Sequence, residues 1–175
     1  MGIGFAYLSV LMDDYSRKII GWSFHKTLEA KGPIAALDMA LKTRTRTNQA
    51  FIHHSDRGVQ YCLGAYVDRL RQAKIVISMT KSGDPNENAL AERVFRTLKE
   101  DFHLRGFPTF VMAETAVEQA ICGYNSVRPH ASLGYKTPNE VYQNQGHQSL
   151  KWYPYKKVQF GNVQYQADNQ FCSPL

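Results

Sequence analysis

The sequence predicts a single domain of the α/β class followed by a polar tail. Short runs of aromatic and branched residues alternate with segments of helical periodicity, in the order strand, strand, helix, strand, helix, strand. A chain of 175 residues, 43% of them hydrophobic, is long enough for one core, and Gln and Asn become frequent after Tyr142. We therefore expect a domain over residues 1–142 and a tail over 143–175.

The first half of the chain supplies the predicted strands. Residues 5–12 (FAYLSVLM) and 19–25 (IIGWSFH) flank a polar corner, which favours a β-hairpin. The elements expected next are a helix over 33–42 with proline in its first turn, a strand over 50–55, a helix over 62–73 and a strand over 74–80.

The second half is predicted to be mainly helical. A strong helix is expected over 89–102 (ALAERVFRTLKEDF), and it should bury one seam formed by Ala91, Phe95, Leu98 and Phe102. Another helix is expected over 113–125. In the tail, residues 158–165 (VQFGNVQY) alternate around a Gly-Asn pair, which predicts a second hairpin.

Composition excludes several classes of protein. No apolar run reaches the roughly 20 residues that a membrane-spanning helix needs, and the N-terminus lacks the basic region and cleavage site of a secretory signal. Cys62, Cys122 and Cys172 are odd in number and far apart, which argues against a disulfide framework or a zinc site. The net charge of +6 suits a phosphate-rich partner without identifying one. We expect a cytoplasmic protein with no membrane partner.

Residues 51–61 (FIHHSDRGVQY) place an acid where a predicted strand ends. Asp56 precedes an Arg-Gly corner, and open α/β sheets bind ligands at the carboxyl ends of strands, so Asp56 is a candidate to face a metal or a substrate. A helix-capping or turn role explains the same pattern. His53 and His54 occupy successive strand positions, so at most one of them faces the site, and a packing or orienting role is favoured there.

A second acid, Glu92, lies in the strong helix, and further motifs accompany the pair. They are HSDRGVQY at 54–61, ENALAE at 87–92, and the series Tyr124-Asn125, Arg128-Pro129-His130, Leu133-Gly134-Tyr135 and Thr137-Pro138. From about Tyr7 to Tyr142 the chain thereby resembles the catalytic core of insertion-sequence transposases and retroviral integrases.

The resemblance implies a ribonuclease-H-like fold, a mixed sheet flanked by helices, and a catalytic triad of two aspartates and a glutamate. Asp56 and Glu92 match the second aspartate and the glutamate, so they are implied as catalytic residues and metal ligands. Phosphoryl transfer between DNA strands uses two Mg²⁺ or Mn²⁺ ions about 3.5 to 4 Å apart, for which carboxylates are suitable hard ligands. Without the resemblance, Glu92 would be taken as the solvated face of an amphipathic helix.

The resemblance also implies DNA, at the element ends and the target, as the partner. Arg96 and Lys99 follow Glu92 on the same helical face and are candidates for a basic track along the DNA end; a merely charged helix surface is the alternative. Arg128 and His130 are candidates to contact phosphate, with a loop tether against the last helix as the alternative. Self-association into homo-oligomers stays open.

The family's first aspartate has no counterpart in this sequence. It lies on a strand that precedes the part resembling residues 7–22, in a segment of the type Trp-x-x-Asp-Ile-Thr, which does not occur here. We therefore expect a core that is incomplete at its N-terminus and lacks the first strand, so that neighbouring strands have unpaired backbone groups. Asp13 and Asp14 are the nearest acids; turn formation is their favoured role, and rescue of the metal site is the alternative.

These expectations converge on a transposase or integrase core fragment. Such a fragment descends from enzymes that cleave and transfer DNA strands in DNA integration, recombination and transposition, and the missing aspartate is expected to impair its activity. The alternative from another class is a non-catalytic remnant that binds nucleic acid. A ribonuclease-H-like nuclease is disfavoured by the motif over residues 124–138. A nucleoid-associated location in the cytoplasm is expected.

Overall fold

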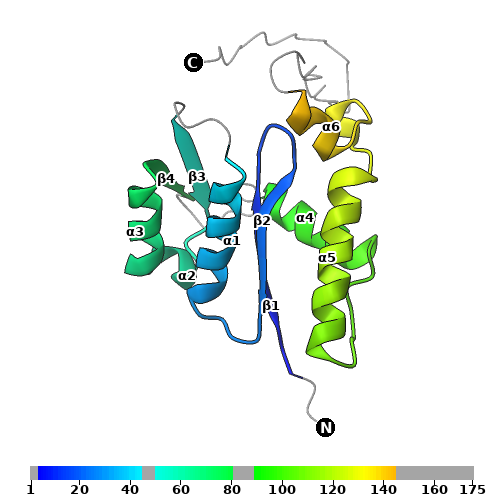
Figure 1. The fold of residues 1–175 in the computed structure, drawn as a ribbon, viewed down its shortest axis with the longest axis horizontal. Coiled ribbons are helices and arrows are strands. Elements are labelled where there is room, and N and C mark those ends of the chain that lie inside the picture. The colour runs from blue at the N-terminus through cyan, green and yellow to red at the C-terminus, as the bar shows by residue number, and fades with distance from the viewer. Residues whose placement is uncertain (1–3, 45–49, 81–88, 145–175) are drawn as a thin grey trace, which may run out of the picture.

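The computed structural model describes residues 4–44, 50–80 and 89–144. It has the expected α/β composition, and Figure 1 shows the strands lying among the helices. The strands are β1 (Tyr7–Met12), β2 (Ile19–His25), β3 (Phe51–Ser55) and β4 (Ile75–Met79). The helices are α1 (Lys31–Lys42), α2 (Val59–Cys62), α3 (Gly64–Gln72), α4 (Ala89–Glu100), α5 (Phe110–Ser126) and α6 (Pro138–Gln143), with a 3-10 turn at Ala131–Leu133.

The strands form two separate pairs. β1 and β2 are antiparallel, with Tyr7 opposite His25, whereas β3 and β4 are parallel, with Phe51 opposite Ile75. Pairing is therefore mixed, as expected, but no hydrogen-bonded ladder joins the two pairs within the described residues. The middle strand that the resemblance implies is not among those residues, and each of the four strands has one unpaired edge there.

The β1–β2 hairpin lies between α1 on one face and α4 and α5 on the other. The core on the α4 and α5 side consists of Ile19, Val94, Leu98, Val117, Ala120, Ile121 and Tyr124. On the α1 side, a Cβ atom at Gly21 would lie 2.1 Å from the carbonyl oxygen of Ala36. Glycine at this position therefore lets α1 approach the backbone of β2 directly.

Helix α1 also packs against the β3–β4 unit. Leu37 of α1 lies in one buried cluster with Tyr66 of α3, and Leu11 of β1 packs against the same cluster. Beside it, Nε of Arg69 on α3 donates to Oδ1 of Asp38 on α1 at 2.6 Å. Helix α1 is therefore the element that joins the two strand pairs.

Part of the C-terminal motif has a structural role. The side chain of Asn125 donates to the carbonyl of Ile19 at 2.9 Å and accepts from the N–H of the same residue at 2.9 Å. Thr137 and Glu140 form a capping box at the start of α6. The hairpin predicted over 158–165 lies outside the described residues. Among the described helices, none combines the length and the hydrophobicity that a membrane span requires.

Candidate metal and nucleic-acid site

Hydrogen bonds hold the corner at which the chain leaves β3. Oδ1 of Asp56 accepts from the N–H of Gly58 at 2.9 Å, and Nε of Arg57 donates to the carbonyl of Thr80, just after β4, at 2.8 Å. A Cβ atom on Gly58 would lie 2.9 Å from the same Oδ1, so a larger residue here would shift the Asp56 carboxylate. Asp56 thus forms the turn that one interpretation of the sequence expected, while its carboxylate stays exposed.

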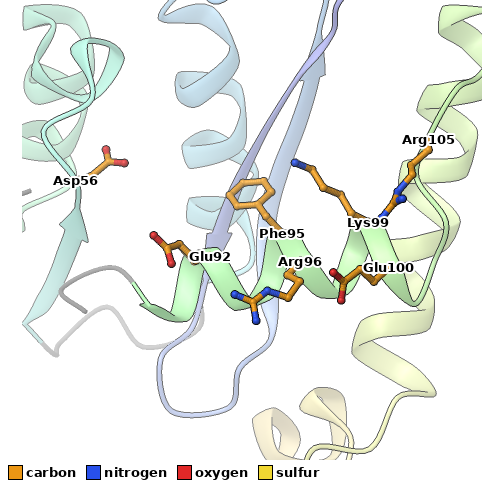
Figure 2. A pocket seen from close by; sticks show the side chains of 8 residues that line it. Asp56, Glu92, Phe95, Arg96, Lys99, Glu100 and Arg105 are labelled. Atoms are coloured by element: carbon orange, nitrogen blue, oxygen red, sulfur yellow. The ribbon is translucent and has the colours of Figure 1, made fainter. Parts of the chain in front are cut away.

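Glu92 lies in the first turn of α4, on the side away from the core. The buried residues of α4 are Val94, Thr97 and Leu98, which leaves Glu92 exposed. Asp56 and Glu92 both line one open pocket of about 560 Å³, and Figure 2 shows their carboxylates pointing toward one another from separate elements. The structure therefore brings together the two acids that the resemblance singled out.

Three basic side chains, those of Arg96, Lys99 and Arg105, line the pocket together with these acids. The remaining lining residues are Ala91, Phe95 and Glu100. Arg96 and Lys99 line the pocket with Glu92, but in Figure 2 their side chains leave α4 in different directions rather than from one helical face. Within the described part of the chain, neither of them forms an ion pair. Their charges are therefore available to a phosphate group.

The donor set of the pocket suits a divalent cation only in part. Carboxylate oxygens are the hard ligands that Mg²⁺ prefers, and Asp56 and Glu92 supply them from two directions. Across residues 4–44, 50–80 and 89–144, however, no group of three or more His, Cys, Asp or Glu side chains gathers at one point. A complete shell around the cation would need waters or a further carboxylate.

Asp13 and Asp14 lie in the turn between β1 and β2 and do not line the pocket. Oδ2 of Asp13 accepts from the N–H of Ser16 at 2.8 Å and from its hydroxyl at 2.5 Å. Asp14 forms an ion pair with Arg17. These contacts are those of the turn role that the sequence favoured.

Arg128 and His130 lie away from the pocket. Nε of Arg128 donates to Oδ2 of Asp101 at 2.8 Å, and the ring of His130 meets that of Tyr124 edge-on, with 4.8 Å between centroids. Burial, helped by nearby arginines, lowers the pKa of His130 to about 4, so its imidazole is neutral at pH 7. These contacts favour the loop tether over the phosphate contact.

Four residues of the pocket, Ala91, Phe95, Glu100 and Arg105, were not assigned to it from the sequence. Phe95 was expected in a buried seam, but it is only half-buried and lines the pocket. Glu100 lies two turns of helix after Glu92, and its place on the same helix is the only feature of the sequence that could have indicated it. Arg105 reaches the pocket after a reversal in which His103 adopts a φ of 52°, and no local pattern predicts that reversal.

Two family models described as integrase core domain match the chain, over residues 2–85 and 73–138. The chain belongs to the integrase core family. The transposase InsF for insertion sequence IS3A of Escherichia coli K12 is 35% identical to this integrase core over 139 residues, which are 78% of the chain and 48% of the relative. The transposase for IS904 of Lactococcus lactis is 33% identical over 141 residues, 78% of the chain and 54% of the relative. The chain spans about half the length of these relatives.

Solved structures with little sequence identity share the fold of this integrase core. A chain of the simian T-cell lymphotropic virus intasome in complex with PP2A regulatory subunit B56 gamma matches with a TM-score of 0.68 and 15% identity, over 89% of this chain and 55% of that one. The HTLV-2 integrase catalytic core domain in complex with magnesium matches with a TM-score of 0.58 and 17% identity, over 76% and 82%. The fold is therefore ribonuclease-H-like.

Proposed function

We propose that this integrase core is by descent the catalytic core of a transposase that acts on DNA, impaired in strand transfer, and that Asp56 and Glu92 are ligands of a divalent cation, Mg²⁺ or Mn²⁺. The observation that supports this most is the convergence of the two carboxylates, one from the turn after β3 and one from α4, on one pocket (Figure 2). Arg96 and Lys99 line the same pocket, and the chain's relatives are insertion-sequence transposases.

Each residue of the pocket has a separate task in this proposal. In a complete two-metal site, the bound ions would activate the attacking hydroxyl and stabilise the leaving oxygen. Asp56 and Glu92 hold a cation by charge and oxygen donation. Arg96 and Lys99 attract the phosphate backbone, and the half-buried ring of Phe95 offers a face on which a base can stack.

Cation binding is tested by thermal unfolding with increasing Mn²⁺. A cation at 100 times its Kd stabilises the fold by about 2.7 kcal/mol, which raises the Tm by several degrees. Asp56→Asn and Glu92→Gln should each remove the rise, whereas Glu118→Gln, at an exposed position on α5, should keep it. A wild-type Tm that ignores saturating Mn²⁺ would rule out the cation role.

DNA binding is expected to be weak, largely independent of sequence and sensitive to salt. Removal of one basic side chain that binds one phosphate should reduce the slope of log affinity against log salt concentration by about 0.9 on duplex DNA. The double variant Arg96→Ala, Lys99→Ala should therefore reduce this slope by about 0.9 for each of the two side chains. The control, Lys42→Ala with Arg71→Ala, removes two exposed cations outside the pocket and should change it less. An unchanged slope in the Arg96→Ala, Lys99→Ala variant would show that these two side chains are only part of a charged helix surface and do not bind DNA.

Strand transfer should need a further acidic ligand, because two metal ions require a carboxylate that bridges them. We propose that the 175-residue chain neither cuts nor joins DNA above background in Mg²⁺. A polypeptide that carries a family-like strand with aspartate ahead of Tyr7 should gain an activity that Asp56→Asn abolishes. Transfer by the 175-residue chain itself, abolished in Asp56→Asn, would overturn this proposal and show that another acid of the chain serves as the third ligand. DNA binding without activity in either polypeptide would mark a non-catalytic remnant.

A further inference from the structure

A hydrogen-bonded pair of polar side chains lies beneath the strand that leads to Asp56. His53 is on β3, and its Nε2 lies 2.9 Å from the hydroxyl of Tyr66 on α3. Tyr66 is completely buried. Strand alternation sends Ile52 and His54 to the opposite, exposed face. Of the two histidines in the motif, His53 is therefore the one that faces the helices.

Tyr61 on α2 completes a cluster that we call the aromatic triad (His53, Tyr61 and Tyr66). The ring centroids of Tyr61 and Tyr66 are 5.4 Å apart and those of His53 and Tyr66 are 5.5 Å apart, both in edge-to-face contact. The triad connects β3 with α2 and α3. Because Asp56 lies between β3 and α2 in the chain, the triad fixes the backbone on both sides of it.

Packing alone does not account for the polar atoms of the triad. Nδ1 of His53 is buried and makes no hydrogen bond within the described residues, which is unfavourable. Burial lowers the pKa of His53 and raises that of Tyr66, so both side chains are neutral at pH 7. An apolar pair of similar size would fill the same space without an unpaired atom. What the hydrogen bond adds is a fixed orientation of the end of β3 against α3.

We propose that His53 and Tyr66 are positioning residues for Asp56, and that their hydrogen bond raises the affinity of the acidic pair for a divalent cation. This role rests on the proposed function, in which Asp56 is a ligand. The connection is short, because only two residues separate His53 from Asp56. A shift of β3 against α3 would move the Asp56 carboxylate relative to Glu92, which α4 holds on a different core cluster.

The experiment measures Mn²⁺ affinity and the free energy of unfolding in the same four variants. Tyr66→Phe removes only the hydroxyl, and His53→Leu removes the imidazole. His53→Gln keeps a polar group that can reach the Tyr66 hydroxyl. Tyr124→Phe is the matched control, because it removes a buried tyrosine hydroxyl from the other core cluster.

Tyr66→Phe and His53→Leu should weaken Mn²⁺ binding about tenfold, the lower end of the range for groups that support a metal ligand, and His53→Gln should stay within about twofold of wild type. Tyr124→Phe should lower the free energy of unfolding without changing the affinity. A purely structural triad would lower stability and leave the affinity of the folded protein unchanged. Equal affinities across the series would therefore overturn the inference while leaving the proposed function intact.

Failure of the proposed function has a different signature. If the wild type binds no Mn²⁺, Asp56 is not a ligand, and its position is then measured through the N–H that Gly58 donates to its Oδ1. Hydrogen exchange of the Gly58 amide should be faster in Tyr66→Phe than in the wild type or in Tyr124→Phe. An unchanged exchange rate would show that the triad does not position Asp56.

Discussion

Replacement of Asn125 by alanine is expected to destabilise the fold by about 2 to 6 kcal/mol. Asn125 is 8% exposed, and it bonds to both backbone groups of Ile19, which is 3% exposed. Alanine leaves that N–H and that carbonyl buried and unpaired, at about 1 to 3 kcal/mol each. Because Asn125 and Ile19 are 106 positions apart, no local structure replaces the missing bonds.

Urea unfolding followed by far-UV circular dichroism measures this loss of stability through the midpoint and the m-value. The control is Asn144→Ala, which removes one exposed hydrogen bond, from Nδ2 to the carbonyl of Glu140 at 2.9 Å, and should cost less than about 1 kcal/mol. If Asn125→Ala costs no more than this control, with the same m-value, then Asn125 does not hold β2 to α5.

Gly21→Ala should cost about 3 kcal/mol or more in urea unfolding, because the new Cβ overlaps a backbone oxygen of α1. Gly64→Ala, with nothing within 4 Å of its Cβ, should be neutral or stabilising by up to about 1 kcal/mol; equal effects would disprove the close-packing argument. Since the pKa of His130 falls from 6.5 to about 4 on folding, the unfolded state takes up the proton first, and stability should fall as pH drops from 6.5 toward 4. Partial exposure limits this loss to about 2 kcal/mol, and His130→Gln should flatten the decline without removing it, because the pKa of His53 is lowered as well. Thr137→Ala removes the capping box of α6 and should cost about 1 kcal/mol, and an unchanged Tm would contradict this.

Local patterns predicted the type of the four strands and of α1, α3, α4 and α5, but not α2 and not every boundary. The single helix expected over 62–73 is α3, and a short α2 precedes it, because Leu63 is extended with φ −66° and ψ 137°. Helical periodicity does not register a break of one residue. Likewise α1 begins at Lys31, ahead of the expected start at Pro33, since proline is tolerated throughout a first turn.

The buried face of α4 shows where local patterns stop being sufficient. Of the seam predicted through Ala91, Phe95, Leu98 and Phe102, Leu98 is buried and Phe102 packs against the core, whereas Ala91 and Phe95 are half-buried and line the pocket. Val94 and Thr97 are buried instead. Two neighbouring faces of this helix carry apolar residues at helical spacing. The face with Ala91 and Phe95 lines the pocket, and the face with Val94 and Leu98 is buried. Which of these faces packs into the core depends on the positions of α5 and of the β1–β2 hairpin. The sequence of α4 alone does not determine those positions.

The candidate acids were identified through the family resemblance, and their geometry needed the structure. The sequence predicts an acid at the end of β3 and another on an exposed helix face, but their convergence depends on how α1 packs. The pairing of Arg128 with Asp101, 27 positions away, likewise has no local signal. The interpretation of Arg128 as a phosphate contact lacked that information.

Asp56 and Glu92 belong to different halves of the molecule, one built around β3 and β4 and the other around the hairpin, α4 and α5. Within the described residues, no ladder of backbone hydrogen bonds connects the two halves. They are held together by side chains, through the cluster around Leu37 and the ion pair between Arg69 and Asp38. Packed helices slide more easily than hydrogen-bonded strands separate. The gap between the two carboxylates therefore depends on how α1 packs against the two halves, and a ligand that contacts both acids would favour the packing that suits it.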